Sequence, residues 1–291
     1  MIFGLDSEYQ KLSSVLLYKP SATIANHPAP AKIQHFAAIN HEKLTDELHV
    51  LIERFSASEV DVTLIEQPVE PDDPANYNMM FCRDLLFMTP QGAILASMAN
   101  SIRRGEVIHA EKALARAGIP LLHRISGNGR FEGADALWIN ERLVAVGVGN
   151  RTNSEAFGQI RKVLALQGVK AVLLASTQNR TQHLLGSLQI VDRDLALVRE
   201  EIISAEVMEF LANQGFRVVP IPENPEIRSR QAMNIVTIAP SKIFMTAGCP
   251  QTKTLYEKAG IEVAAELHIS QLINGAGGLA CATGTLARVS L

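Results

Sequence analysis

Apolar residues recur along this chain with two spacings that alternate from one end to the other. In five stretches they lie three and four residues apart, which is the period of an amphipathic helix. The helices predicted from this spacing are residues 41–55, 106–118, 153–168, 205–215 and 251–260. Four of them end at a glycine, the residue type that most often takes the left-handed conformation after a helix. These glycines are Gly118, Gly168, Gly215 and Gly260.

Short apolar stretches before and after these helices predict strands. One strand follows each helix, at residues 61–67, 119–125, 169–176, 216–222 and 261–267. A pair of strands joined by a tight turn precedes each of the later helices, at residues 85–98, 136–149, 188–200 and 235–248. The order strand, strand, helix, strand therefore recurs about five times, with roughly 45 to 65 residues from one helix to the next.

A repeat of this length indicates equivalent units, and five of them could close into a ring. An ordinary α/β domain would show the same alternation, so the pattern alone leaves both interpretations open. Because no low-complexity linker divides the chain, we expect one domain over residues 1–291. The proline-rich residues 66–78 form the longest predicted loop.

Composition narrows the class of partner. The chain has 291 residues, of which 47% are hydrophobic, enough for a sizeable core. Its formal charge of −3 gives no electrostatic footprint for nucleic acid or for an anionic membrane, so we expect a small-molecule partner. The opening sequence MIFGLDSEYQKL lacks the basic and apolar segments of a secretory signal, and no apolar run approaches the length of a membrane span. We therefore expect a cytoplasmic protein.

The three cysteines, at positions 82, 249 and 281, are too few and too scattered to predict a disulfide framework or a zinc site. We expect reduced thiols and no metal. Buried cysteine behaves as a small hydrophobe, which is the expectation for Cys82 and Cys249. Cys281 differs, because the sequence GAGGLACAT places it after three glycines within four positions. Glycine permits positive φ and close backbone approach, which could leave the sulfur accessible and direct backbone N–H groups at it, favouring the thiolate.

Three further segments carry candidate chemistry, and each precedes a predicted strand. Asp84 in FCRD is either a surface turn residue or a binding group. Glu132 and Asp135 in FEGAD are carboxylates next to an apolar strand, which is costly unless they are paired, so they indicate a cap or a cation site. His183 in TQHLLG is either structural or a proton carrier, since its unperturbed pKa is close to neutrality.

These motifs, taken in order along the chain, resemble a known family. The segments KLSSVLLYKP, FCRD, FEGAD, GVGNRTN, HLLG, MNIVTIAPSKIFMTAG and GGLAC are similar to those of the guanidino-group-modifying enzymes of the pentein fold. That family includes arginine deiminase, dimethylarginine dimethylaminohydrolase and the amidinotransferases. The resemblance implies an α/β propeller of five ββαβ units around a central axis. NMMFCRD, FEGADALW and GVGNRTN look most like the arginine dihydrolases, which convert arginine to ornithine, ammonia and carbon dioxide.

The resemblance implies a role for each motif residue. Cys281 would be the nucleophile and His183 the general acid and base. Glu132 would orient and charge the site, and Asp84 would bind the guanidinium. The other residues expected to bind substrate are Asn78, Asp135 and the arginines that would hold the α-carboxylate, namely Arg151 and Arg103 or Arg104.

The chain departs from the family pattern at one position. Deiminases and amidinotransferases have an aspartate two residues after the histidine, where this chain has Leu185. Asn78, in the loop before FCRD, is either the polar substitute for that aspartate or a turn residue.

The resemblance therefore implies a hydrolase that acts on the guanidino group of arginine through a covalent cysteine thiouronium, without a cofactor. The product would be ornithine for a dihydrolase or citrulline for a deiminase. The alternatives are an amidinotransferase that uses an amine acceptor and a non-catalytic binding protein of the same fold. A homo-oligomer is compatible with the sequence.

Overall fold

The computed structural model describes residues 3–25, 27–66, 76–175 and 181–289. Most of the predicted loop 66–78 lies outside these residues. The strands form five sheets of three strands each, which confirms the repeat predicted from the sequence. Each sheet joins an antiparallel pair to a third, parallel strand, and a helix makes the parallel connection.

Four of the five units are continuous in sequence. Their elements are β3 (Leu86–Thr89), β4 (Gly92–Leu95), α2 (Glu106–Arg116) and β5 (Leu121–Arg124); β6 (Ala136–Asn140), β7 (Leu143–Val148), α3 (Ser154–Ala165) and β8 (Lys170–Ala175); β9 (Leu188–Asp192), β10 (Leu195–Arg199), α4 (Ala205–Asn213) and β11 (Arg217–Ile221); and β12 (Val236–Ala239), β13 (Lys242–Thr246), α6 (Pro250–Lys258) and β14 (Glu262–Leu267).

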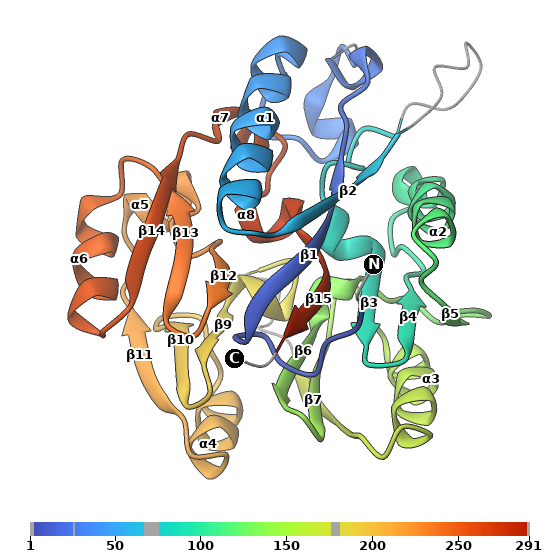
Figure 1. The fold of residues 1–291 in the computed structure, drawn as a ribbon, viewed down its shortest axis with the longest axis vertical. Helices are drawn as coiled ribbons and strands as arrows, with labels where there is room; N and C mark the ends of the chain where they lie inside the picture. The colour runs from blue at the N-terminus through green and yellow to red at the C-terminus, as the bar shows by residue number, and fades with distance from the viewer. Residues whose placement is uncertain (1–2, 26, 67–75, 176–180, 290–291) are drawn as a thin grey trace.

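The fifth unit combines the two ends of the chain. Its elements are β15 (Gly284–Val289), β1 (Lys11–Tyr18), α1 (His41–Ala57) and β2 (Asp61–Ile65). Strand β1 pairs antiparallel with β15 and parallel with β2, so the last strand of the chain completes a sheet that the first strands begin. Figure 1 shows α2, α3, α4 and α6 at the periphery and the first strand of each unit toward the centre.

The helices begin and end where their sequences supply capping groups. The side chains of Asn40, Asn153 and Ser204 each accept a hydrogen bond from a backbone N–H in the first turn of α1, α3 and α4. The four glycines predicted to end helices all have positive φ, between 71° and 86°. Both ends of α3 and α4 are therefore encoded locally, as are the start of α1 and the ends of α2 and α6, which explains why these positions could be predicted.

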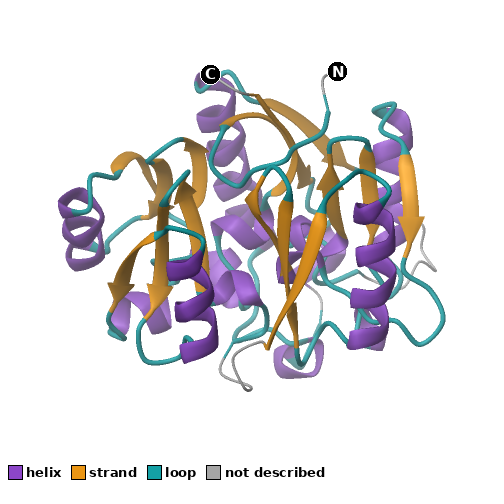
Figure 2. Cartoon of the chain, turned by 90° about the horizontal axis from the view of Figure 1, so that it is seen from below, coloured by secondary structure: helices purple, strands orange, loops and turns teal. Residues whose placement is uncertain are grey.

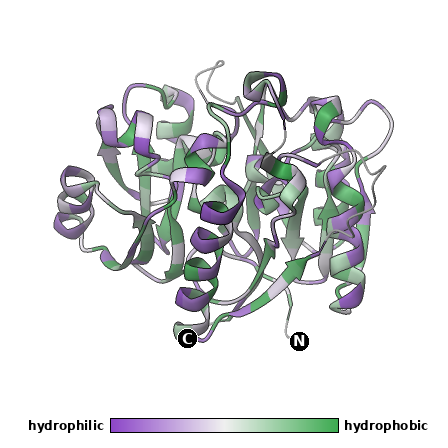
Figure 3. Ribbon diagram, turned by 90° about the horizontal axis from the view of Figure 1, so that it is seen from above, coloured by the Kyte–Doolittle hydropathy of each residue, from purple (hydrophilic) through white to green (hydrophobic). Residues whose placement is uncertain are grey.

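The core lies between the strands and the inner faces of the helices. Figure 2 shows strands inside and most helices outside, and Figure 3 shows apolar residues concentrated on the strands. Trp138 is fully buried, stacks on Phe87 with ring centroids 5.8 Å apart, and donates its indole N–H to the carbonyl of Met88. In the described part of the chain, no helix is both long enough and apolar enough to cross a bilayer.

Three short helices were not predicted: α5 (Pro225–Arg230), α7 (Ser270–Asn274) and α8 (Leu279–Ala282). None is long enough to show a helical period in the sequence. Two of them follow β14 in sequence and lead the chain to β15, and α8 carries Cys281.

Candidate active site

A cavity of about 560 Å³ brings together residues from several units, including Asp84, His183 and Cys281. Each of these residues lies just before the first strand of its unit: Asp84 before β3, His183 before β9 and Cys281 before β15. Glu132 lies just before β6. It is not among the residues that line the cavity, but it contacts His183, which is. The repeat therefore converts distant positions in the sequence into neighbours.

The three glycines before Cys281 are required for space. None of them is in the left-handed region, and the residue with positive φ is Ala276, so the expectation of positive φ at the glycines is wrong. The expected close approach is confirmed. A Cβ at Gly277 would lie 2.3 Å from Cε1 of Phe81, and one at Gly275 would lie 2.1 Å from Cε of Met80. Met80, which precedes FCRD, and Phe81, its first residue, therefore pack directly onto the segment that carries the sulfur.

Replacing Gly277 by alanine should lower the free energy of unfolding by about 1–3 kcal/mol, because Phe81 must move to accommodate the new methyl group. Urea denaturation followed by circular dichroism would measure the change. The matched control is Gly158→Ala in α3, where nothing lies within 4 Å of the added carbon. That control should gain about 0.5–1 kcal/mol from helix propensity. Equal stability changes for the two variants would contradict the packing argument.

Asp84 has one carboxylate oxygen that lacks a hydrogen-bond donor among the described residues of this site. Its side chain is buried, so the surface-turn interpretation is wrong. Oδ2 accepts a hydrogen bond of 2.6 Å from Nη1 of Arg103. Oδ1 is buried, has no hydrogen-bond partner among the residues described, and lies 3.7 Å from Nδ1 of His183. A buried carboxylate oxygen without a donor is costly, which marks this atom as a position for a cationic ligand.

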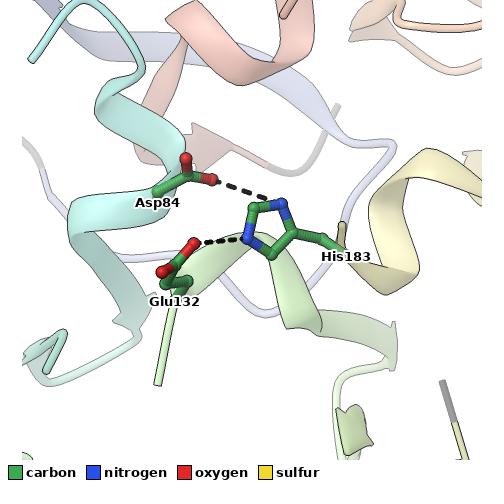
Figure 4. Close-up of side chains that lie close together, drawn as sticks. All are labelled: Asp84, Glu132 and His183. Atoms are coloured by element: carbon green, nitrogen blue, oxygen red, sulfur yellow. Dashed lines mark hydrogen bonds and ion pairs between the residues drawn. The ribbon is translucent and has the colours of Figure 1, made fainter. Parts of the chain in front are cut away.

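His183 lies between the two carboxylates that Figure 4 shows. Its Nε2 is 2.7 Å from Oε2 of Glu132, and the Asp84 contact is on the other ring nitrogen. Burial alone would lower the pKa of His183, but the charges of Asp84, Asp135 and Glu132 outweigh burial and raise it to about 9. Burial alone would raise the pKa of Glu132, but His183, Arg103 and Arg151 lower it to about 2. The pair is therefore an imidazolium and a carboxylate at neutral pH.

Asp135 does not line the cavity, in contrast to its expected contact with substrate. Its Oδ1 accepts from the backbone N–H of Leu184 at 2.9 Å, and its Oδ2 accepts from the Thr152 hydroxyl at 2.7 Å. Burial raises its pKa to about 6. Asp135 thus fixes the backbone beside His183, and neither it nor Glu132 caps a helix through its side chain.

The three candidate arginines lie in different surroundings. Arg104 is exposed and is not among the cavity residues. Arg103 lines the cavity but donates to Asp84, to Glu106 at 2.9 Å and to the carbonyl of Asn78. Its guanidinium lies at the same end of the site as Asp84, so the geometry does not support its predicted contact with an α-carboxylate. Arg151 lines the cavity, donates to Gln182 and lies 3.6 Å from Glu132.

Glu106 and Asn78 both contact Arg103, and no sequence pattern pointed to Glu106. In the sequence, Glu106 is an ordinary acidic residue at the start of a predicted helix. In the structure it is fully buried, and burial raises its pKa to about 7. The side-chain amide of Asn78 donates to the carbonyl of Ile33 at 2.9 Å, and its backbone N–H donates to Glu106. Asn78 and Leu185 both line the cavity, but the amide nitrogen of Asn78 is already paired.

Cys281 lines the cavity and is partly exposed, whereas Cys82 and Cys249 are buried as predicted. Burial, and after it the charge of Asp84, raises the pKa of Cys281. The expectation that the free protein favours the thiolate is therefore wrong. Asn234, which the sequence analysis missed, lies beside the sulfur, with Nδ2 3.0 Å from Sγ. An asparagine before a strand is so common at turns that its type alone carries no signal.

Asp84, Glu132 and His183 each bring one potential ligand atom to within 4.8 Å of the others, a spacing that could hold a metal ion. Nε2 of His183 already contacts Oε2 of Glu132, and Oδ2 of Asp84 already accepts from Arg103. Oδ1 of Asp84 is the buried oxygen of this group that accepts no hydrogen bond from the described residues. A ligand that brings N–H donors would satisfy this oxygen.

Comparison with known proteins gives consistent matches. A family model described as arginine deiminase matches residues 45–215 and 203–288. An uncharacterized protein of Bacillus subtilis, YkgA, is 26% identical over 97% of this chain and 94% of its own. An arginine deiminase of Listeria welshimeri is 25% identical over 74% of this chain and 62% of its own.

Solved structures share the fold at lower identity. The N-terminal domain of ArgZ, covalently bonded to a reaction intermediate, superimposes with a TM-score of 0.80 at 17% identity, covering 94% of this chain and 98% of that one. A dimethylarginine dimethylaminohydrolase variant from Pseudomonas aeruginosa, complexed with citrulline, gives 0.75 at 19% identity and the same coverages. An inosamine-phosphate amidinotransferase from Streptomyces griseus gives 0.76 at 16%, covering 100% of this chain and 98% of its own.

Proposed function

Because the chain belongs to the arginine deiminase family of pentein-fold, guanidino-modifying enzymes, we propose that it hydrolyses the guanidino group of arginine through a covalent bond to Cys281. The observation that carries this proposal is that Oδ1 of Asp84 accepts no hydrogen bond from the described residues, in the cavity that also contains Cys281 and His183. A guanidinium is a planar cation with several N–H donors, so it supplies what this oxygen lacks.

The first half of the reaction uses the protonation states of the free site. A bound guanidinium places positive charge beside Cys281, which favours loss of the thiol proton to solvent. The thiolate adds to the guanidinium carbon, and a tetrahedral adduct forms. His183, protonated at neutral pH, gives its proton to the departing nitrogen as the C–N bond breaks, and ammonia leaves. The product of this half is a thiouronium on Cys281.

In the second half, the now neutral His183 takes a proton from water, and the hydroxide adds to the thiouronium carbon. Breaking the C–S bond then releases citrulline from a deiminase. In a dihydrolase, the citrulline is attacked again before release, which yields a second ammonia, carbon dioxide and ornithine. Glu132 holds His183 in place through both halves by the 2.7 Å contact.

The remaining contacts orient the substrate. Arg151 is the proposed partner of the α-carboxylate, because it lines the cavity and its guanidinium is less committed than that of Arg103. Asn78 is the proposed second contact to the guanidinium. Its amide nitrogen is bonded to Ile33 and its side chain also makes a hydrogen bond with His35, so a substrate N–H would use the second lone pair of the amide oxygen.

Incubation with free arginine, followed by quantification of ammonia, citrulline and ornithine, tests the proposal. A deiminase should release one ammonia per citrulline, and a dihydrolase two ammonia per ornithine. The Cys281→Ser protein is the matched control for spontaneous breakdown. A new guanidino compound formed only when an amine acceptor is added would instead identify an amidinotransferase. No consumption of arginine under any of these conditions would refute arginine as the substrate.

A further inference from the structure

The fivefold repeat places a polar side chain two to five residues before the first strand of every unit. Asp84, Glu132, His183 and Cys281 hold this position before β3, β6, β9 and β15. The equivalent position before β12 is held by Asn234. Building on the function proposed above, we propose that Asn234 is a catalytic residue that donates a hydrogen bond to the sulfur of Cys281 and stabilises its thiolate.

Two contacts fix the direction of the Asn234 amide. Nδ2 lies 3.0 Å from Sγ of Cys281, and Oδ1 accepts a 3.1 Å hydrogen bond from the backbone N–H of the same residue. A backbone N–H can only donate, so the amide oxygen must face it. The NH₂ group is thereby directed at the sulfur. The reverse orientation would set two donors against each other at the backbone.

The surrounding backbone holds Asn234 in this position. Its own N–H donates to the carbonyl of Gln231 at 2.8 Å. A Cβ at Gly278 would lie 2.8 Å from both Cβ and Cγ of Asn234. The third glycine of GAGGLACAT is thus explained, because any side chain at position 278 would displace the amide from the sulfur.

The groups around the sulfur mostly oppose the thiolate, so a donor that stabilises it is needed. Asp84 disfavours the thiolate, and burial disfavours it more strongly, while Arg103 favours it only weakly. His183 also lines the cavity, but its positive charge is paired with the carboxylate of Glu132. The Asn234 amide and the backbone N–H of Gly278 are neutral donors that act on the sulfur directly. A neutral donor stabilises the thiolate without repelling a cationic substrate.

The test is the pH dependence of alkylation of Cys281 by iodoacetamide, since the thiolate is the reactive form. Peptide mass mapping separates Cys281 from Cys82 and Cys249. In Asn234→Ala the apparent pKa of Cys281 should rise by about 1–2 units, because a hydrogen bond to a charged group is lost. In Asn234→Asp it should rise further, because a carboxylate replaces the donor.

The aspartate variant separates the donor to the sulfur from the acceptor that holds the backbone N–H of Cys281. It keeps an oxygen to accept from the N–H of Cys281, and it replaces the donor to Sγ by a negatively charged acceptor. Asn213→Ala, at the exposed end of α4, is the matched control and should leave the profile unchanged. An unchanged alkylation pKa in Asn234→Asp would overturn the proposal, even if Asn234→Ala fails to fold. Because alkylation needs no substrate, this result is independent of whether arginine is turned over.

Discussion

Replacing Cys281 by serine is expected to abolish ammonia release from arginine while arginine still binds. A serine hydroxyl ionises far less readily than a thiol, and His183, which is protonated at neutral pH, cannot act as the base that would activate it. The loss in kcat should be at least about 10⁴-fold, as for removal of other covalent nucleophiles. Binding should persist because Asp84, which holds the guanidinium in this proposal, is untouched.

Ammonia release measures the loss in this variant, and isothermal titration with arginine measures the binding. Cys249→Ala is the matched control, because Cys249 is buried, is not among the cavity residues, and its thiol donates a weak hydrogen bond to the carbonyl of Ala247. That control should keep near-normal turnover. If Cys281→Ser retained a substantial fraction of activity, the sulfur could not be the nucleophile, and the covalent route would be wrong.

The fold could be predicted because its signals are local. Each long helix shows its period in the sequence, and four end at glycines that the structure finds at positive φ. The closure of the fifth sheet was implied only by the family resemblance, because β1 and β15 lie at opposite ends of the chain. The short helix α8 was missed, since four residues show no period.

The site was partly predictable because charged and reactive residues before strands attract attention. Asp84, Glu132, His183 and Cys281 were identified in this way, and the structure brings them together. Asn234 escaped notice because a neutral asparagine at a turn is commonplace. Its place shortly before the first strand of a unit was the signal that could have identified it, because the other four units already had a candidate residue there.

Which charged residues form ion pairs with one another could not be predicted from the sequence. Arg103 was expected to bind substrate, yet its guanidinium is held by Asp84 and Glu106. Whether an arginine is free depends on which carboxylates lie within about 4 Å, and the two here are 19 residues before it and three residues after it. The same holds for Cys281, whose pKa is raised by burial and by Asp84 despite its glycine-rich neighbourhood.

These charges indicate a site that is primed by its substrate. In the free protein, burial and Asp84 keep Cys281 largely a thiol, and three carboxylates keep His183 protonated. A guanidinium bound at Oδ1 of Asp84 would neutralise the charge that opposes the thiolate. Nucleophile and acid would then be ready together only when substrate is present, which protects the sulfur from unproductive reactions.

Replacing His183 by alanine should block turnover at a defined stage. Without the imidazolium, the departing ammonia receives no proton, so the thiouronium should form slowly if at all. Any adduct that forms should persist, because no base remains to activate water. Intact-protein mass spectrometry after incubation with arginine should therefore show either unmodified protein or a stable adduct on Cys281. His183→Gln is the matched control, because its amide keeps a polar group against Glu132 but has no proton that it can transfer at neutral pH.

The pH profile of the native protein gives a second readout for His183. Its pKa is raised from 6.5 to about 9, so the acid form is present at neutral pH and is lost as the pH passes 9. Steps that need the acid should therefore slow above that pH, and the slowing should be absent from the residual activity of His183→Gln. Multiple turnovers of ammonia by His183→Ala at a rate near that of the native protein would show that another group carries the proton. In that event Glu132, with its pKa of about 2, could not be that group, since it binds protons too weakly at neutral pH.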